Sequence, residues 1–153
     1  MKTVRLYIET SFKGPVVKDG KYAAALVFTK ADGQSAFRII SGGEEETTCN
    51  RLTLIAAERA LERMKEKCHI IIYTDNLYVK GMIEQGNPEK WRRAEWKKAA
   101  GGEVQNKELW QTFLEKADKQ EIEMRFSKFN EFQKKLQVVM QGEETGNDGL
   151  RVL

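Results

Sequence analysis

The segment His69–Tyr73 (HIIIY) constrains the fold more than any other, because a strand of this sequence is apolar on both faces. Strands of this kind usually lie in the centre of a sheet and run parallel to a neighbour. The segment before it begins at Thr47 or Thr48 and repeats apolar residues at helical spacing to about Lys67. A strand before this helix and another after it predict a crossover between parallel strands.

Earlier in the chain, three segments are typical of strands. Val4–Glu9 alternates apolar and polar residues, and Tyr22–Thr29 and Ser35–Ile40 follow it. Asp19-Gly20 predicts a turn before the second strand, and Gly42-Gly43 predicts the end of the third. Short connections between consecutive strands predict an antiparallel meander.

The rest of the chain alternates again between helical and strand patterns. A short helix is expected over Asn76–Glu84, a second over about Asn106–Lys119 and a strand over Ile122–Phe126. A closing helix carries an apolar stripe of Phe129, Phe132, Leu136, Val139 and Met140. The prediction is one α/β domain over residues 1–140, with order βββαβααβα, followed by a flexible, glycine-rich C-terminal tail over residues 141–153.

Composition excludes several classes of function. With 153 residues the chain is long enough to bury a single core without staples. Cys49 and Cys68 are its only cysteines and His69 its only histidine, which is too few for a disulfide framework, a zinc cluster or a serine–histidine mechanism. No apolar run approaches a membrane span, and the start MKTVRLYIET lacks the features of a secretory signal. We therefore expect a cytoplasmic protein with no membrane partner.

Four motifs in order resemble the type 1 ribonuclease H family. Thr47–Leu52 (TTCNRL) is similar to the family's TTNNR(M/A)E helix start, and Tyr73–Val79 (YTDNLYV) to its TDSQYV. Trp91–Trp110 resembles the basic protrusion of the bacterial enzymes, and Asn130–Leu136 (NEFQKKL) resembles N-E-x-x-D-x-L of the last helix. The resemblance implies an RNase H-like fold, in which a mixed five-stranded sheet has helices on both faces.

The family's chemistry needs carboxylates that converge on Mg²⁺ ions about 4 Å apart. The resemblance implies four acids, and the corresponding positions here are Glu9, Thr53, Asp75 and Lys134. Only Asp75 is unchanged. Glu9 keeps the charge but is one methylene longer, Thr53 is neutral, and Lys134 places a cation at a ligand position. We therefore expect a divergent member with a degraded active site.

A residual metal site is one interpretation of the remaining acids. Glu9 and Asp75 would hold Mg²⁺ or Mn²⁺, with Glu131 as the only substitute for the missing ligand of the last helix. Otherwise no cofactor is expected. The alternative is that both acids are relics and that Glu9 pairs with Lys134, so that a fixed charge replaces the metal.

Nucleic-acid binding is expected from two segments. Thr48, Asn50 and Arg51 match the family's loop that contacts the hybrid backbone, although Thr48 can equally be a helix cap. The protrusion combines cations, which neutralise phosphates, with aromatic rings, which pack on sugars or bases, unless its tryptophans belong to the core. Its candidate binding residues are Trp91, Arg92, Arg93, Trp96, Lys97 and Lys98.

Three functional hypotheses follow from these residues. The first is an RNase H-like protein that binds RNA/DNA hybrid or duplex and has lost hydrolytic activity. The second is an active, divergent Mg²⁺-dependent ribonuclease H that cleaves RNA in RNA/DNA hybrids. The third is a protein-interaction module on the same fold, whose partner the sequence does not identify. Cleavage of hybrids and salt-dependent binding distinguish the three.

Overall fold

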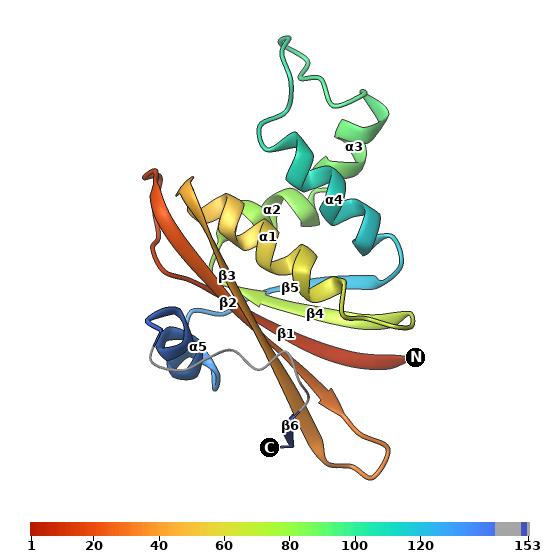
Figure 1. Cartoon of the computed structure of the whole chain (residues 1–153). Coiled ribbons are helices and arrows are strands. Elements are labelled where there is room, and N and C mark those ends of the chain that lie inside the picture. Colours follow the sequence, from red (N-terminus) through yellow and green to blue (C-terminus); the bar gives the residue numbers. More distant parts are fainter. Residues whose placement is uncertain (143–150, 153) are drawn as a thin grey trace.

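The computed structural model describes residues 1–142 and 151–152, which form a mixed sheet with helices on both faces (Figure 1). The elements in chain order are β1 (Lys2–Thr10), β2 (Lys18–Thr29), β3 (Ser35–Thr47), α1 (Cys49–Leu61), β4 (Cys68–Thr74), α2 (Leu77–Glu84), α3 (Asn87–Arg93), α4 (Lys107–Ala117), β5 (Glu121–Phe126), α5 (Gln133–Met140) and β6 (Arg151–Val152). The sheet order is β5-β4-β1-β2-β3-β6. Strands β1, β2 and β3 are antiparallel neighbours, whereas β4 is parallel to β1 and to β5. The meander and the parallel crossover are confirmed.

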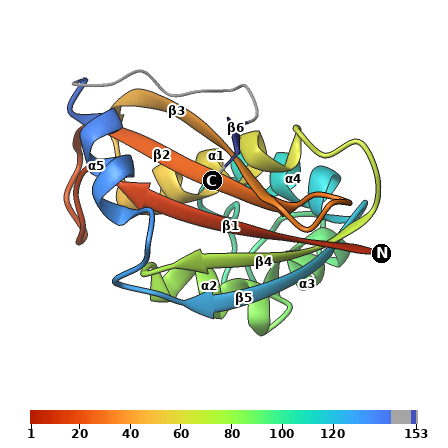
Figure 2. The same cartoon turned by 90° about the horizontal axis from the view of Figure 1, so that it is seen from below.

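Two hydrophobic layers hold the helices against the sheet. Helices α1 to α4 lie on one face and α5 lies on the other (Figures 1 and 2). Alternation along β1 sends Leu6 and Ile8 into the α1 layer, and Tyr7 into the α5 layer beside Phe132. The expected five-stranded sheet with helices on both faces is confirmed, and α3 and the short β6 add to the expected order. No helix in the described part of the chain has the length and apolarity to cross a membrane.

Two glycine segments have a different role from the predicted turns. Strand β3 continues through Gly42 and Gly43, because these residues pack against the neighbouring strand. A Cβ atom on Gly42 would lie 2.5 Å from the Tyr22 hydroxyl, and one on Gly43 would lie 2.8 Å from the Gly20 carbonyl oxygen. Asp19-Gly20 lies within β2 at a register shift of the β2–β3 ladder. Both glycine segments allow close approach and not chain reversal.

Element ends differ from the sequence prediction at three further places. Helix α1 ends at Leu61, six residues before the predicted end at Lys67. Phe129 does not join the apolar stripe of α5, and 77% of its surface is exposed. The predicted tail over 141–153 falls largely on residues 143–150 and 153, which lie outside the described residues, whereas Arg151 and Val152 pair with β3.

Candidate active site

Glu9 and Asp75 lie at the same edge of the sheet because β1 and β4 are parallel. Glu9 is the last residue but one of β1, and Asp75 directly follows β4. The carboxyl ends of parallel strands meet at one edge, where α/β proteins commonly place ligand sites. The side chain of Glu9 is only 4% exposed and that of Asp75 is 18% exposed. The sequence prediction that these two acids are neighbours agrees with this geometry.

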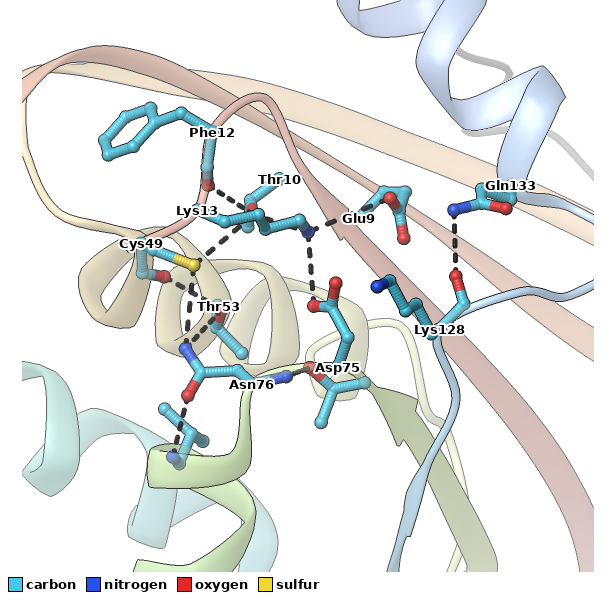
Figure 3. A network of polar contacts seen from close by, with 12 residues as sticks. Glu9, Thr10, Phe12, Lys13, Cys49, Thr53, Asp75, Asn76, Lys128 and Gln133 are labelled. Carbon is cyan, nitrogen blue, oxygen red and sulfur yellow. Dashed lines mark hydrogen bonds and ion pairs between the residues drawn. The ribbon is translucent and has the colours of Figure 1, made fainter. Parts of the chain in front are cut away.

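Lys13, in the loop after β1, links the two carboxylates (Figure 3). Its Nζ atom donates to Asp75 Oδ1 at 3.2 Å and to the Thr10 hydroxyl at 3.0 Å, and it lies 3.8 Å from Glu9 Oε1. Burial raises the pKa of Glu9 and the negative charge of Asp75 raises it further, whereas the Lys13 ammonium lowers it. The chain thus supplies its own cation between its two acids.

Thr53 belongs to a neutral hydrogen-bond network behind these acids. It is 2% exposed, and its hydroxyl donates to the Cys49 carbonyl oxygen at 2.8 Å and accepts from Asn76 Nδ2 at 3.2 Å. The same Asn76 amide donates to Asn50 Oδ1 at 2.9 Å, and its Oδ1 atom accepts from the Val79 backbone amide at the start of α2. Hydroxyl and amide groups therefore fill the place where the resemblance implies a carboxylate.

Helix α5 turns Gln133, and not Lys134, toward the site. Gln133 and Gln137 line a groove with Glu9, whereas Lys134 is exposed and is not part of that lining. Gln133 Nε2 donates to the Lys128 carbonyl oxygen at 2.8 Å, in the short connection between β5 and α5 (Figure 3). The placement of Lys134 at the site, including its ion pair with Glu9, was wrong because this short connection sets another register for the helix.

Glu131 does not complete a metal site. Its Oε1 atom accepts from Arg5 Nη1 at 3.2 Å and from the Tyr7 hydroxyl at 3.4 Å, and the Tyr7 ring stacks on Tyr73 with centroids 4.7 Å apart. Within residues 1–142, no three His, Cys, Asp or Glu side chains converge as metal ligands. The set Glu9, Asp75 and Glu131 is therefore not assembled in this structure.

The residues present do not fit the two-metal centre that the fold implies. Carboxylates occupy only two of the four expected positions, those of Glu9 and Asp75. The ammonium of Lys13 lies between them, and a divalent cation at the same place would meet strong repulsion. The neutral Thr53 adds no compensating charge. We therefore derive no step of chemistry through a metal at this site.

Arg51 is held by acids and does not offer a free guanidinium to phosphate. Its Nε and Nη2 atoms donate to the two Glu44 oxygens at 2.8 and 3.0 Å, and Nη1 donates to Glu108 Oε1 at 2.6 Å. These hydrogen bonds lower the pKa of Glu44 and of Glu108. Arg51 thus ties β3 and α1 to α4. Thr48 caps α1 by accepting from the Arg51 backbone amide at 3.2 Å, which confirms the capping alternative.

The basic protrusion, residues 91–110, extends from the sheet on α3 and the loop before α4 (Figure 1). Trp96 is 8% exposed, and Trp91 is half-buried with its ring 5.4 Å from that of the fully buried Trp110. These side chains are part of the core on the α1 face. Trp96 therefore cannot stack on a base without leaving that core, and the structure favours the alternative in which this tryptophan belongs to the core.

The cations of the protrusion divide into two groups. Arg92 Nη2 lies 3.0 Å from Asp118 Oδ2, and Arg93 Nε lies 3.9 Å from Glu89 Oε1. Lys97 and Lys98 are exposed, and Lys97 belongs to an isolated bridge that closes the loop with Glu103 through the backbone. The exposed lysines can neutralise a phosphate at the lowest cost in free energy, because the arginines would first have to leave their acidic partners.

Sequence reasoning missed three residues that build the site. Lys13 lies against both carboxylates, Gln133 lines the groove with Glu9, and Asn76 organises the network around Thr53. A lysine four residues after a strand-end acid is a weak signal, since loop conformation decides where its ammonium lies. Asn76 was detectable as an N-cap of the predicted helix, although its second contact was not.

Comparison with known proteins gives concordant results. The family model described as RNase H matches residues 1–128. Ribonuclease H of Hahella chejuensis is 36% identical over 132 residues, which cover 84% of this chain and 82% of that protein. Ribonuclease H of Acetivibrio thermocellus is 36% identical over 111 residues, which cover 72% of this chain and 71% of that protein. The crystal structure of a type 1 RNase H with the type 2 active-site motif shares the fold, with a TM-score of 0.78, 21% identity and coverage of 99% of this chain and 78% of that chain.

Proposed function

Since the chain belongs to the ribonuclease H family, we propose that it binds nucleic acid, as RNA/DNA hybrid or duplex, without cleaving it at the Glu9–Asp75 edge. The observation that carries the proposal is the position of Lys13 Nζ, 3.2 Å from Asp75 Oδ1 and 3.8 Å from Glu9 Oε1. Hydrolysis by this family requires charge from bound metal at that place. The internal ammonium supplies charge there but no activated water.

The neutral network around Thr53 supports the loss of hydrolysis independently. A bridging carboxylate is replaced by a hydroxyl whose donor and acceptor roles are both satisfied within the protein. Restoring metal affinity would require breaking those hydrogen bonds as well as displacing Lys13. The Lys13 ammonium and the neutral network around Thr53 therefore both oppose metal binding.

Binding is supported by the cations that remain exposed. Lys97 and Lys98 on the protrusion and Lys128 beside the Asp75 groove have exposed side chains. Phosphate contacts of this kind give salt-dependent affinity and little sequence preference. Arg51 contributes little to this affinity, because Glu44 and Glu108 neutralise it.

Hydrolysis of the RNA strand of hybrids is the second candidate, and one observation favours it. The curated relatives that align over most of the chain carry the name Ribonuclease H. An active enzyme would have to use Glu9 and Asp75 with Mg²⁺ or Mn²⁺ after Lys13 has moved away. The contacts of Lys13 favour binding without cleavage, whereas sequence similarity to these relatives favours cleavage.

One experiment tests binding and cleavage together. A labelled RNA/DNA hybrid is titrated at about 50 mM salt, where electrostatic binding is strong, and the RNA strand is then examined on a denaturing gel. We expect salt-dependent binding with intact RNA in Mg²⁺. The double variant Lys97→Ala/Lys98→Ala should bind more weakly and reduce the log–log salt slope by up to about two.

The matched control is Arg92→Ala/Arg93→Ala, which removes the same charge from residues with acidic partners and should have the smaller effect. Absence of affinity for hybrid, duplex and single strand would reject nucleic-acid binding and favour the protein-interaction module.

A further inference from the structure

The exposed apolar side chains are concentrated around the Glu9–Asp75 edge. Apart from Met1, every exposed large hydrophobic residue in the described part of the chain lies on the loop after β1, the start of α2, the end of β5 or the connection from β5 to α5. We call this set the apolar rim. Its members are Val16, Val17, Leu77, Tyr78, Phe126 and Phe129.

Strand pairing brings the segments of the apolar rim together. Phe126 pairs with Thr74 across the β4–β5 ladder, and the Ser127 amide donates to the Thr74 carbonyl oxygen at 3.0 Å. Leu77 starts α2 three residues after Thr74, so it lies near the end of β5. Leu77 and Phe126 line one groove of about 540 Å³ with Pro15, next to Val16.

Contact of these large apolar side chains with water is unfavourable in free energy, and the fold does not require it. Phe129 is 77% exposed, Phe126 is 50% exposed and Tyr78 is 44% exposed. Several large apolar side chains exposed at one edge of a fold often mark an interaction site. The aromatic half of the apolar rim offers ring faces, which aliphatic residues cannot provide.

Lysines are interleaved with the apolar rim, which favours a polyanionic ligand. Lys13 and Lys128 line the same groove, and Lys18 follows Val17. The Lys128 ammonium lies 5.8 Å from the centroid of the Phe129 ring. Asp75 is the only acid in the lining of this groove, and Lys13 already pairs with it. Cations beside exposed rings are the features that bind single strands, since phosphates contact the cations and bases stack on the rings.

We propose that the apolar rim stacks unpaired nucleobases, so that single-stranded nucleic acid binds more tightly than the fully paired hybrid or duplex of the proposed function. This inference rests on the proposed nucleic-acid binding and specifies its class of ligand. Bases in a duplex present only their edges, whereas unpaired bases present the faces that Phe126, Phe129 and Tyr78 can contact. The neutralised Arg51 removes one of the contacts expected for a duplex backbone.

The test compares anisotropy titrations of the full chain with one labelled RNA strand, free and as a hybrid of the same sequence, about 15 nucleotides long. We expect tighter binding of the free strand. Phe126→Leu and Phe129→Leu keep apolar surface but remove the ring, and each should weaken single-strand binding roughly tenfold and hybrid binding much less. Phe28→Leu removes a ring near the start of β1, at the other end of the sheet from the apolar rim, and is the matched control, with affinity unchanged.

The possible outcomes separate this inference from the function it rests on. Wild-type protein that prefers the hybrid, or leucine variants that bind single strands as well as wild type, would overturn stacking while leaving nucleic-acid binding in place. No affinity for either ligand would reject both proposals and indicate that the apolar rim binds a protein. A circular dichroism melt shows whether each variant is folded, and the exposure of Phe129 makes its substitution safe for the fold.

Discussion

Lys13 Nζ lies 3.2 Å from Asp75 Oδ1 and 3.8 Å from Glu9 Oε1, so a fixed cation of the chain occupies the space between the two remaining acids. The side chain of Glu9 is 4% exposed and that of Asp75 is 18% exposed, and two such carboxylates repel each other unless a cation is near. In this protein that cation is the ammonium group of Lys13, which belongs to the chain itself. The Lys13 ammonium therefore offsets part of the negative charge at this edge of the sheet.

Removing this internal cation should make the site responsive to metal. Lys13→Met leaves Glu9 and Asp75 facing each other, so millimolar Mn²⁺ should raise the melting temperature of the variant by a few degrees and leave wild type unchanged, since a ligand that binds only the folded state stabilises it. Lys128→Met removes a nearby charge without this pairing and is the control. Equal Mn²⁺ shifts in wild type and Lys13→Met would contradict the stand-in role of Lys13.

Rebuilding the donor set should depend on the observed register of α5. We expect the variant Glu9→Asp, Lys13→Ser, Thr53→Glu and Gln133→Asp to bind Mn²⁺ in a calorimetric titration. The same variant with Lys134→Asp in place of Gln133→Asp should bind about tenfold more weakly or not at all, because Lys134 is exposed. Tighter binding by the Lys134→Asp version would show that the motif alignment, and not the structure, gives the right position.

Arg51 is predicted to act on stability more than on binding. Arg51→Met leaves Glu44 without its bidentate partner and should lower the free energy of unfolding by about 1–2 kcal/mol at pH 7. Because the pKa values of Glu44 and Glu108 are lowered in the folded state from 4.5, this stabilisation is present above about pH 4.5 and is lost as the pH falls below it.

Urea denaturation at pH 7 and pH 3 measures the effect of Arg51→Met. The control is Arg125→Met, which removes one partner of the exposed ion pair between Arg125 and Glu123. A large loss of hybrid affinity in a stable Arg51→Met protein would restore the backbone-contact role implied by the resemblance.

Glu58 should make stability depend on pH in the opposite direction. Burial, together with the hydrogen bond and the negative charge of Glu62, raises its pKa to about 7. The folded protein therefore binds an additional proton between about pH 4.5 and 7, so this contribution is most favourable at the acidic end and is lost as the pH rises through 7. Glu58→Gln should thus stabilise the protein by about 1–2 kcal/mol at pH 8 and have little effect at pH 4.5.

The control is Glu115→Gln, which makes the same change in a side chain that is 68% exposed and should alter the free energy of unfolding by no more than about 0.5 kcal/mol. Urea midpoints for Glu58→Gln that differ from wild type equally at both pH values would indicate a packing effect and not titration.

Much of the fold was predictable because its patterns are local and periodic. The alternation of Val4–Glu9 and the two-sided apolar run His69–Tyr73 predict the strands β1 and β4, whereas the closeness of Glu9 and Asp75 was implied by the family resemblance. The cap at Thr48 was predictable for the same reason, since it depends on residues within one helical turn.

The parts that failed depend on contacts between distant segments or on loop geometry. Lys13 is 62 residues from Asp75, and only the conformation of the loop after β1 brings its ammonium to that carboxylate. The register of α5 follows from the short connection after Phe126, which motif spacing does not describe. Gly42 looked like a strand end because its packing against Tyr22 lies across the sheet. The charged residues beside Trp96 in the sequence likewise suggested an exposed segment, although its ring is buried.

The central claim is that the Glu9–Asp75 edge no longer cleaves RNA, and the Asp75 dependence of turnover tests it most directly. The measurement is the rate of cleavage of a labelled RNA/DNA hybrid in Mg²⁺ and in Mn²⁺ by wild type and by Asp75→Asn, purified in parallel. We expect both proteins to give the same background rate. Turnover by wild type that disappears in Asp75→Asn would contradict it and establish an active, divergent ribonuclease H.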